Sequence, residues 1–266
     1  MPRPLPETAA AFLDLVQTVA RLRRECPWDR EQTPKSIMPF LVEETYEVLE
    51  ALEAENPQEL SGELGDLLLQ ILLHAEMASE RGEFDVRDVI ERVRDKMIRR
   101  HPHVFGDLAV SGSGEVLANW SRIKAEERRA AEKDASTLAG VPSALPALLR
   151  AERLGEKAAS VGFDWGDAPS VLAKVREELG ELEAAVRAGK PAEVESELGD
   201  CLFALASLGR KSGVSAEFAL RRTLDRFAER FRFIEAELQS TGRPIGDTSL
   251  DEMEALWQEA KRRELR

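Results

Sequence analysis

Residue types that mark particular protein classes are scarce in this sequence. Its two cysteines, Cys26 and Cys201, are too few for a disulfide framework, and we expect both to be largely buried thiols in a reducing compartment. No apolar run approaches the roughly 20 residues that a membrane-spanning helix needs. The N-terminal residues also lack the apolar core of a signal peptide. These absences predict a cytoplasmic protein with no membrane partner.

Aromatic residues, at 6%, are also few, and no segment alternates polar and apolar residues convincingly enough to predict a strand. Ala, Leu, Glu and Arg dominate instead, and this mixture favours helix over sheet. Apolar residues make up 43% of the 266 positions, so the chain is long enough to bury the core of one large or two modest domains. We therefore expect an all-α fold.

Positive charge is in deficit. The chain has 37 Lys and Arg against 50 Asp and Glu, which gives a formal net charge of −13. Such a protein has no overall electrostatic attraction for nucleic acid or anionic lipid. An anionic substrate must then be held by local basic groups or by bound cations. The charge therefore disfavours a nucleic-acid partner and favours a metal-dependent site.

Apolar residues recur at helical spacing along most of the chain, and Pro, Gly and capping residues interrupt the pattern. The predicted helices cover about residues 12–22, 35–54, 58–82, 86–100, 115–133, 147–160, 169–188, 192–212, 215–240 and 250–266. Between residues 134 and 146 the composition shifts to Ser, Thr, Gly and Pro, which is typical of a linker. This predicts an N-terminal helical domain over residues 1–133, a linker over 134–146 and a C-terminal helical domain over 147–266.

The two halves carry the same acidic motif at a constant separation. Val42-Glu-Glu-Thr-Tyr-Glu47 matches Arg176-Glu-Glu-Leu-Gly-Glu181, and Gly62-Glu-Leu-Gly-Asp66 matches Ser196-Glu-Leu-Gly-Asp200, each 134 residues later without a gap. Weaker counterparts, at slightly different separations, pair Lys96, Arg100, Trp120 and Lys124 with Arg226, Arg230, Trp257 and Lys261. A fixed period is the signature of a repeat architecture. The chain is therefore predicted to be a tandem duplication of one helical unit.

The acidic residues of each motif share a helix face. Glu44 and Glu47 are three positions apart, as are Glu63 and Asp66 on the next predicted helix. If these helices pack antiparallel, as the short break at Asn56-Pro57 favours, four carboxylates converge and repel one another. A divalent cation compensates this repulsion, and oxygen-only ligands suit Mg²⁺ or Mn²⁺. The repeat predicts a second set of four ligands: Glu178, Glu181, Glu197 and Asp200.

Two other interpretations of these carboxylates are weaker. Acidic residues on helices usually form a solvated face, but a second occurrence at the same spacing makes coincidence improbable. The neighbouring apolar residues, such as Leu64, Ile71 and Leu198, also predict that the second helix of each pair is buried. A ferritin-like di-iron bundle requires Glu-x-x-His pairs, and neither half places His three residues after a motif glutamate. His101-Pro-His103 is a poor metal site, because Pro102 interrupts any helix there.

At these motifs the chain resembles the MazG family of nucleoside triphosphate pyrophosphohydrolases, and the resemblance extends over nearly the whole length. The segments that carry it are Cys26-Pro-Trp-Asp29, Glu43-Glu-Thr-Tyr-Glu47, Gly62-Glu-Leu-Gly-Asp66, Arg99-Arg-His-Pro-His-Val-Phe105, Val161-Gly-Phe-Asp-Trp165 and Trp257-Gln-Glu-Ala-Lys261. The resemblance implies two MazG-like helical-bundle domains that hydrolyse nucleoside triphosphates to the monophosphate and pyrophosphate. Stacking of the base on Trp257 would accept any base, so we expect broad base tolerance and a role in nucleotide-pool housekeeping. The family forms dimers, so we expect a homodimer, and the alternative is that the two repeats pair within one chain.

The resemblance also implies roles for individual residues. Mg²⁺ is expected on both sets of four carboxylates, and Mn²⁺ is a possible substitute. The implied nucleotide contacts in the second half are Lys174, Arg226, Arg230, Trp257 and Lys261, and their repeat counterparts in the first half are Lys96, Arg100, Trp120 and Lys124. Glu177 and Glu43 adjoin the metal ligands, and we expect them to orient or deprotonate the attacking water.

Other functions remain open at this point. A relative of the same superfamily with a narrower substrate, such as dUTP or phosphoribosyl-ATP, would share these motifs. A non-catalytic helical interaction protein could instead use the carboxylates for metal-dependent assembly. The two repeats also differ, because Phe40 stands at the position of Lys174. The first half therefore lacks a positive group near its carboxylates, and we expect the second site to be the main catalyst.

Overall fold

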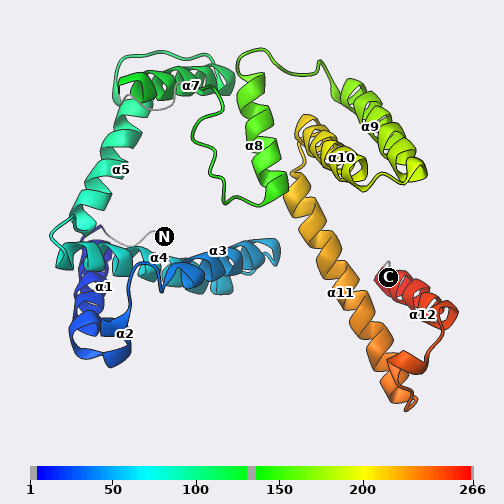
Figure 1. Cartoon of the computed structure of the whole chain (residues 1–266). Helices are drawn as coiled ribbons and strands as arrows, with labels where there is room; N and C mark the ends of the chain where they lie inside the picture. The colour runs from blue at the N-terminus through cyan, green and yellow to red at the C-terminus, as the bar shows by residue number, and fades with distance from the viewer. Residues whose placement is uncertain (1–4, 131–135, 265–266) are drawn as a thin grey trace. The chain divides into compact units, whose positions relative to one another are not determined.

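A computed structural model describes residues 5–130 and 136–264, and all regular structure within these ranges is helical (Figure 1). The chain divides into two compact units, Met1–Trp120 and Ser121–Arg266. The predicted all-α fold is therefore confirmed. The dividing point falls within α7 (Ser113–Ala130), whereas the predicted domain boundary at residues 133 and 134 lies outside the described residues.

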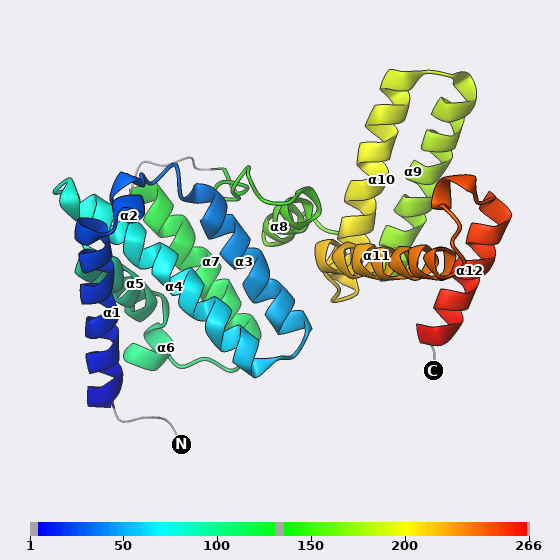
Figure 2. The same cartoon turned by 90° about the horizontal axis from the view of Figure 1, so that it is seen from below.

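The first unit contains two long helices that form an antiparallel hairpin, α3 and α4, with α1 packed against α4 (Figure 2). Its helices, in chain order, are α1 (Leu5–Glu25), α2 (Pro27–Glu31), α3 (Met38–Glu53), α4 (Pro57–Glu80), α5 (Val86–Arg100), α6 (Pro102–Phe105) and α7, which continues past the dividing point. The predicted helices agree with these bounds to within a few residues, except that α1 begins earlier and that α2 and α6 were not predicted.

Local capping explains where these helices begin. The Asn56 side chain accepts hydrogen bonds from the backbone N–H groups of Gln58 (3.2 Å) and Glu59 (3.3 Å), and Pro57 occupies the first turn of α4. Asp85 caps α5 in a reciprocal capping box with Asp88. Each cap satisfies backbone donors that have no partner inside the helix.

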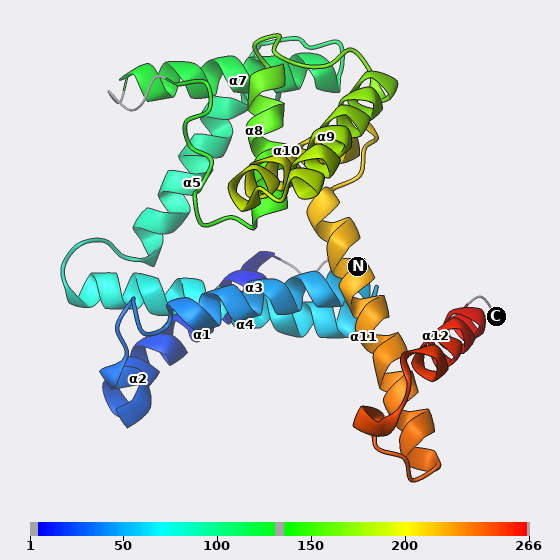
Figure 3. The ribbon, with the colours of Figure 1, turned by 45° about the vertical axis from the view of Figure 1, so that its right-hand side comes forward.

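The second unit repeats the hairpin with α9 and α10, which lie side by side in Figures 1 and 3. Its helices are α8 (Ala147–Ala159), α9 (Ala168–Ala188), α10 (Pro191–Lys211), α11 (Ala216–Ser240), the short η1 (Ile245–Asp247) and α12 (Leu250–Glu264). Helices α8, α9 and α11 pack against α10, and α12 packs against α11. Gly189 ends α9 in the left-handed conformation, with φ of 65°.

The core of each unit lies on one face of its hairpin. In the first unit, Val19 of α1 and Ile37 pack with Leu72, Leu73 and Met77 of α4. In the second unit the buried apolar residues lie on four helices: Val171, Val175 and Ala185 of α9, Cys201, Ala204 and Ala206 of α10, Ile234 and Leu238 of α11, and Ala260 of α12. The expected burial of Cys201 is confirmed, while Cys26 is half-buried.

The opposite face of each hairpin is apolar and exposed. Leu64, Ile71 and Leu198 lie on this face, so the expectation that they are buried is wrong within a single unit. The reason is that helical periodicity identifies an apolar face but not the element that covers it. The exposed positions repeat between the units: Met38, Leu52, Leu64 and Ile71 in the first match Leu172, Val186, Leu198 and Leu205 in the second.

In each unit, ion pairs join a neighbouring segment to the C-terminal end of the second helix of the hairpin. In the first, the buried Arg23 of α1 pairs with Glu80 of α4 at 2.6 Å and donates to the Asp29 carbonyl. In the second, Asp164, in the loop before α9, pairs with Arg210 and Lys211 of α10. The acid lies on the second helix of the hairpin, α4, in the first unit, whereas the bases lie on the second helix, α10, in the second unit.

No helix in the described ranges combines the length and apolar content needed to cross a bilayer.

Candidate metal and nucleotide site

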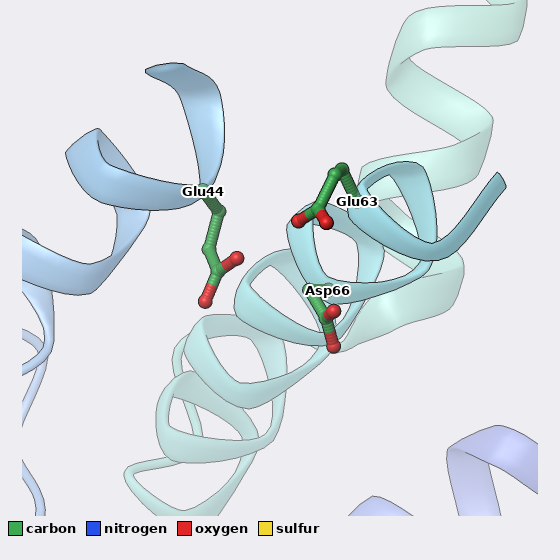
Figure 4. Close-up of side chains that lie close together, drawn as sticks. All are labelled: Glu44, Glu63 and Asp66. Atoms are coloured by element: carbon green, nitrogen blue, oxygen red, sulfur yellow. The ribbon is translucent and has the colours of Figure 1, made fainter. Parts of the chain in front are cut away.

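In the first unit, carboxylates from both helices of the hairpin converge. Glu44 of α3 faces Glu63 and Asp66 of α4, and one oxygen from each lies within 4.8 Å of the others (Figure 4). Glu63 and Asp66 share a face because they are three residues apart on one helix. The antiparallel packing of α3 then brings Glu44 opposite them. The predicted convergence of these three side chains is confirmed.

The carboxylates of this cluster repel one another, and the pKa values of two of them are raised. Partial burial, together with the hydrogen bond and charge of Glu47, raises the pKa of Glu44. Partial burial and the charges of Glu47 and Asp66 likewise raise the pKa of Glu63. Glu47 thus lies beside the group, although it is not one of the three residues whose oxygens lie within 4.8 Å. A bound cation would relieve this repulsion.

The second unit forms the matching cluster at the repeat positions. One carboxylate oxygen from each of Glu178 of α9 and Glu197 and Asp200 of α10 lies within 4.8 Å of the others. Glu178 is buried. Partial burial raises the pKa of Glu197, and the charges of Glu181 and Asp200 add to the shift. Burial and the same cluster of charges raise the pKa of the Cys201 thiol, so Cys201 stays protonated beside the site.

Both clusters fit a hard divalent cation. Each offers three convergent carboxylate oxygens and no nitrogen or sulfur ligand, and Mg²⁺ and Mn²⁺ are usually held by a few carboxylates with water and phosphate completing the shell. The fourth predicted ligand of each set, Glu47 or Glu181, is exposed at the edge of the cluster. The structure therefore assembles three of the four predicted ligands closely and places the fourth beside them.

One position distinguishes the two clusters. The Lys174 ammonium lies 2.7 Å from a Glu177 oxygen and 2.6 Å from a Glu178 oxygen, and these two carboxylates raise its pKa. At the equivalent position Phe40 packs edge-on against Trp28, with ring centroids 6.1 Å apart. The predicted general bases Glu177 and Glu43 are both exposed beside their clusters. In the second unit the base candidate is therefore held by Lys174, and this pairing was not predicted.

The implied nucleotide contacts of the second unit lie on another hairpin, formed by α11 and α12. The Arg230 guanidinium lies over the Trp257 ring, 5.3 Å from its centroid, and Arg226 donates to the Thr223 hydroxyl at 2.9 Å. Lys261 is exposed on α12. Among the described residues of this unit, α12 packs against α11 and makes no extensive contact with α9 or α10.

Phe227 is an aromatic neighbour that the sequence did not single out. Its ring lies 5.1 Å from the Trp257 ring and 6.2 Å from the Phe231 ring. The signal was present as an apolar stripe on α11, but such a stripe ordinarily indicates a core face. In the structure Phe227 and Phe231 are exposed, so the Trp257 ring belongs to an accessible aromatic group.

The corresponding residues of the first half are more dispersed. Lys96 lines a shallow groove on α5 together with Phe84 and Val93, and Arg100 ends that helix. Trp120 of α7 packs against His101, with ring centroids 5.4 Å apart, and Lys124 lies one turn further along α7. His101 and His103 contact each other, and the His101 Nδ1–H donates to the Met97 carbonyl at 2.6 Å.

Comparison with known proteins places these clusters in a family. The sequence model of the MazG nucleotide pyrophosphohydrolase domain matches residues 32–105 and 167–233, and each stretch contains one carboxylate cluster. The chain is 44% identical over 256 residues to the nucleoside triphosphate pyrophosphohydrolase of Escherichia coli (strain K12), covering 96% of this chain and 97% of that protein.

A second relative agrees with this match. The nucleoside triphosphate pyrophosphohydrolase/pyrophosphatase MazG of Thermotoga maritima is 40% identical over 259 residues, covering 97% of this chain and 98% of that protein. The crystal structure of a mazG-related protein from Thermotoga maritima covers 42% of this chain and 96% of its own, at 28% identity and a TM-score of 0.38. The sequences alone carry the conclusion: this chain belongs to the MazG nucleotide pyrophosphohydrolase family, as a tandem pair of all-helical MazG-like repeats.

Proposed function

We propose that this chain hydrolyses nucleoside triphosphates to the nucleoside monophosphate and pyrophosphate with Mg²⁺ as cofactor. The observation that carries the proposal is the convergence of three carboxylates on each helical hairpin, at positions where the sequence matches the family twice. The relatives from Escherichia coli and Thermotoga maritima, which match over nearly their whole length, are named for this activity.

Different side chains would bind the cation and the phosphate groups. Glu178, Glu181, Glu197 and Asp200 would hold the cation in the second unit, and Glu44, Glu47, Glu63 and Asp66 in the first. When bound, Mg²⁺ supplies positive charge that neutralises the triphosphate and polarises the phosphoryl group under attack. Arg226 and Arg230 would bind phosphate oxygens through their guanidinium groups.

Proton transfer falls to the exposed glutamates next to the ligands. The reaction consumes one water, breaks the bridging P–O bond between the α and β phosphates and releases one proton. Glu177 lies one residue before the metal ligand Glu178, so it is placed to accept that proton from the attacking water. Glu43 holds the same position in the first unit. The Lys174 ammonium, 2.7 Å from a Glu177 oxygen, would help to orient this carboxylate.

Base tolerance follows from the kind of contact that the base would receive. Trp257 and the neighbouring Phe227 offer aromatic faces, and stacking accepts every base because each has a π-face. This suits a housekeeping enzyme that acts on many nucleotides of the cellular pool. A pyrophosphate-release assay over all common nucleoside triphosphates, dUTP and phosphoribosyl-ATP tests the proposal, with EDTA as the control. Turnover of a single substrate would contradict the base tolerance, and no turnover with Mg²⁺ would contradict the activity.

We also propose that the chain acts as a homodimer in the cytoplasm. The exposed apolar faces of the two hairpins support this, since apolar patches of this kind on helices ordinarily mark an interface. The equivalent positions in both repeats are exposed, so a second copy can cover both hairpins by the same mode of packing. The net charge of −13 supports the further proposal that neither nucleic acid nor a membrane is a partner.

A further inference from the structure

The two carboxylate clusters differ in the cation that the protein itself provides. Lys174 is placed at one turn's distance from Glu178 on α9, and their charged atoms are 2.6 Å apart. The side chain of Glu178 is only 8% exposed, whereas that of Lys174 is 35% exposed. In the first unit the same helix position holds Phe40, which contacts Trp28 and carries no charge.

The Glu178 carboxylate that pairs with Lys174 is also one of the predicted metal ligands. Glu178 is one of the three carboxylates whose oxygens converge within 4.8 Å, and it is the most buried of them. Charge pairs at such a buried carboxylate are screened less than pairs at the surface. A divalent cation that enters this cluster must therefore share Glu178 with Lys174 or displace the ammonium group. The first cluster presents no such competitor at the Phe40 position.

We propose that Lys174 is an internal counter-ion of the second cluster, which a divalent cation displaces from Glu178 and which the triphosphate of the substrate then binds. This inference rests on the proposed function, since it assigns the metal and the nucleotide to the same site. In the aligned stretches 40–47 and 174–181, and 63–66 and 197–200, two positions differ by a full charge: Phe40 and Val42 of the first unit are replaced by Lys174 and Arg176 in the second. Of these two cations, Lys174 pairs with Glu178.

The consequence is a coupling between metal and nucleotide that the first site lacks. Without nucleotide, the displaced ammonium would lose its pair with Glu178 and keep only the exposed Glu177 as a partner, which weakens metal binding. With a triphosphate present, phosphate oxygens receive the ammonium, so metal and nucleotide bind the second site cooperatively. The coupling is reciprocal, because each ligand must raise the affinity of the other by the same factor. The first site lacks this contribution to the coupling, because Phe40 carries no charge.

Direct Mn²⁺ titration monitored by electron paramagnetic resonance tests this without turnover. The Glu63→Gln variant serves as the parent, because the loss of one ligand silences the first cluster and isolates the second. In this parent, Lys174→Met is expected to tighten Mn²⁺ binding about fivefold in the absence of nucleotide, as expected for the loss of a partly exposed competing ion pair. An α,β-methylene triphosphate analogue is expected to tighten Mn²⁺ binding more in the parent than in the Lys174→Met variant.

Two matched variants separate this inference from a general change in charge. Lys190→Met removes a lysine from the same hairpin, where Lys190 pairs at 2.8 Å with Glu193, which is not one of the three converging carboxylates, and it is expected to leave Mn²⁺ affinity within about twofold. In a Glu197→Gln parent, Phe40→Lys is expected to weaken Mn²⁺ binding at the first cluster about fivefold relative to Phe40→Met. Circular dichroism checks that each variant keeps its helical content.

The inference is overturned if the folded Lys174→Met variant binds Mn²⁺ as weakly as its parent, or if Lys190→Met has the same effect as Lys174→Met. It is also overturned if the triphosphate analogue tightens Mn²⁺ binding equally with and without Lys174. These outcomes are independent of the proposed function, which is tested separately by pyrophosphate release from the wild-type chain.

Discussion

At the scale of single residues, Glu197 and Glu63 occupy equivalent positions in clusters that differ in their neighbours. We predict that Glu197→Gln lowers pyrophosphate release by at least about a hundredfold, as expected for the loss of a metal ligand in a phosphoryl-transfer site. Glu63→Gln is predicted to lower it less than about threefold, because the first cluster lacks the cation that Lys174 supplies in the second. Steady-state turnover of the two variants checks this, and loss of activity in Glu63→Gln alone would reverse the assignment.

Asp164 joins the loop before α9 to the end of α10. Its carboxylate pairs with Arg210 and Lys211, and the side chains of all three are less than one fifth exposed. We predict that Asp164→Asn lowers the free energy of unfolding by about 2 kcal/mol, because it leaves two partly buried cations without their partner. Denaturation by urea measures this change. Asp251→Asn, at an exposed position on α12, is the control and is expected to change stability by less than about 0.5 kcal/mol.

The same residue predicts a pH dependence. The hydrogen bond from Arg210, with that from Lys211, holds the pKa of Asp164 well below its usual range. A carboxylate with a lowered folded-state pKa contributes stability that is fully present above its unfolded pKa of about 4 and is lost as the pH falls further. The stability difference between wild type and Asp164→Asn should therefore be constant between pH 6 and 8 and shrink below about pH 4. Urea denaturation at pH 7 and pH 3 compares the two, and a difference that persists unchanged at pH 3 contradicts the assignment.

The sequence predicted the carboxylates of the site but not their pairing with Lys174. The repeat identified the acidic positions because both halves keep the same spacing. Lys174 lies three residues before Glu177 and four before Glu178, and either spacing places charges on one helix face. Spacing alone therefore could not show that the ammonium contacts both, nor that Glu178 is the more buried partner.

At the scale of elements, the connections of the two hairpins are equivalent but differ in strain. Gly189 follows α9 with φ of 65°, and Glu55, at the matching position after α3, has φ of 51°. Glycine adopts this left-handed conformation without steric cost, whereas other residues rarely do. We predict that Gly189→Ala destabilises the chain by about 1 kcal/mol and that Glu55→Gly stabilises it by a similar amount.

Thermal unfolding of these two variants is a paired test, because one variant removes a glycine and the other introduces one at equivalent positions. A lower melting temperature for both variants would show that side-chain contacts of Glu55, rather than its backbone conformation, dominate at that turn. For Gly189→Ala, a steric clash cannot explain a lower melting temperature, because the added methyl carbon meets no atom within 4 Å.

The long helices were predictable from sequence, and the short ones were not. Asn56, Asp85 and Pro191 act as starting signals, and the structure begins α4, α5 and α10 at or next to them. Helices α2 and α6, of five and four residues, are too short to show an apolar repeat. Pro102 was expected to interrupt the helix. It follows the end of α5 at Arg100 and begins α6.

At the scale of the whole molecule, the exposed hairpin faces are the surfaces that we propose to pair in a homodimer. We predict that a double variant, Leu198→Glu with Leu205→Glu, converts the homodimer to a species of lower mass, because charges buried against an apolar partner face are costly. Light scattering coupled to size-exclusion chromatography measures the mass. Leu250→Glu, at an exposed leucine outside the hairpins, is the control and should leave the mass unchanged.

Assembly is also where sequence reasoning reached its limit. The stripe of apolar residues on α10 predicts a covered face, and the same stripe arises whether the cover comes from its own chain or from another. In the structure, α8 and α9 cover one side of α10 and leave Leu198, Leu202 and Leu205 exposed. The homodimer therefore stays a prediction. A monomer in solution at micromolar concentration would contradict it.

The short connection within each hairpin also has a consequence for how the chain folds. The close ligands of the first cluster span only residues 44–66, and those of the second span 178–200. Contacts between residues this near in sequence close small loops, which cost little entropy and form early. During synthesis, each hairpin can bring its own carboxylates together before the remainder of its repeat has been made. The emerging chain would then carry repelling charges, and the proposed cation, taken from the surrounding solution, would make metal binding part of folding rather than a step that follows it.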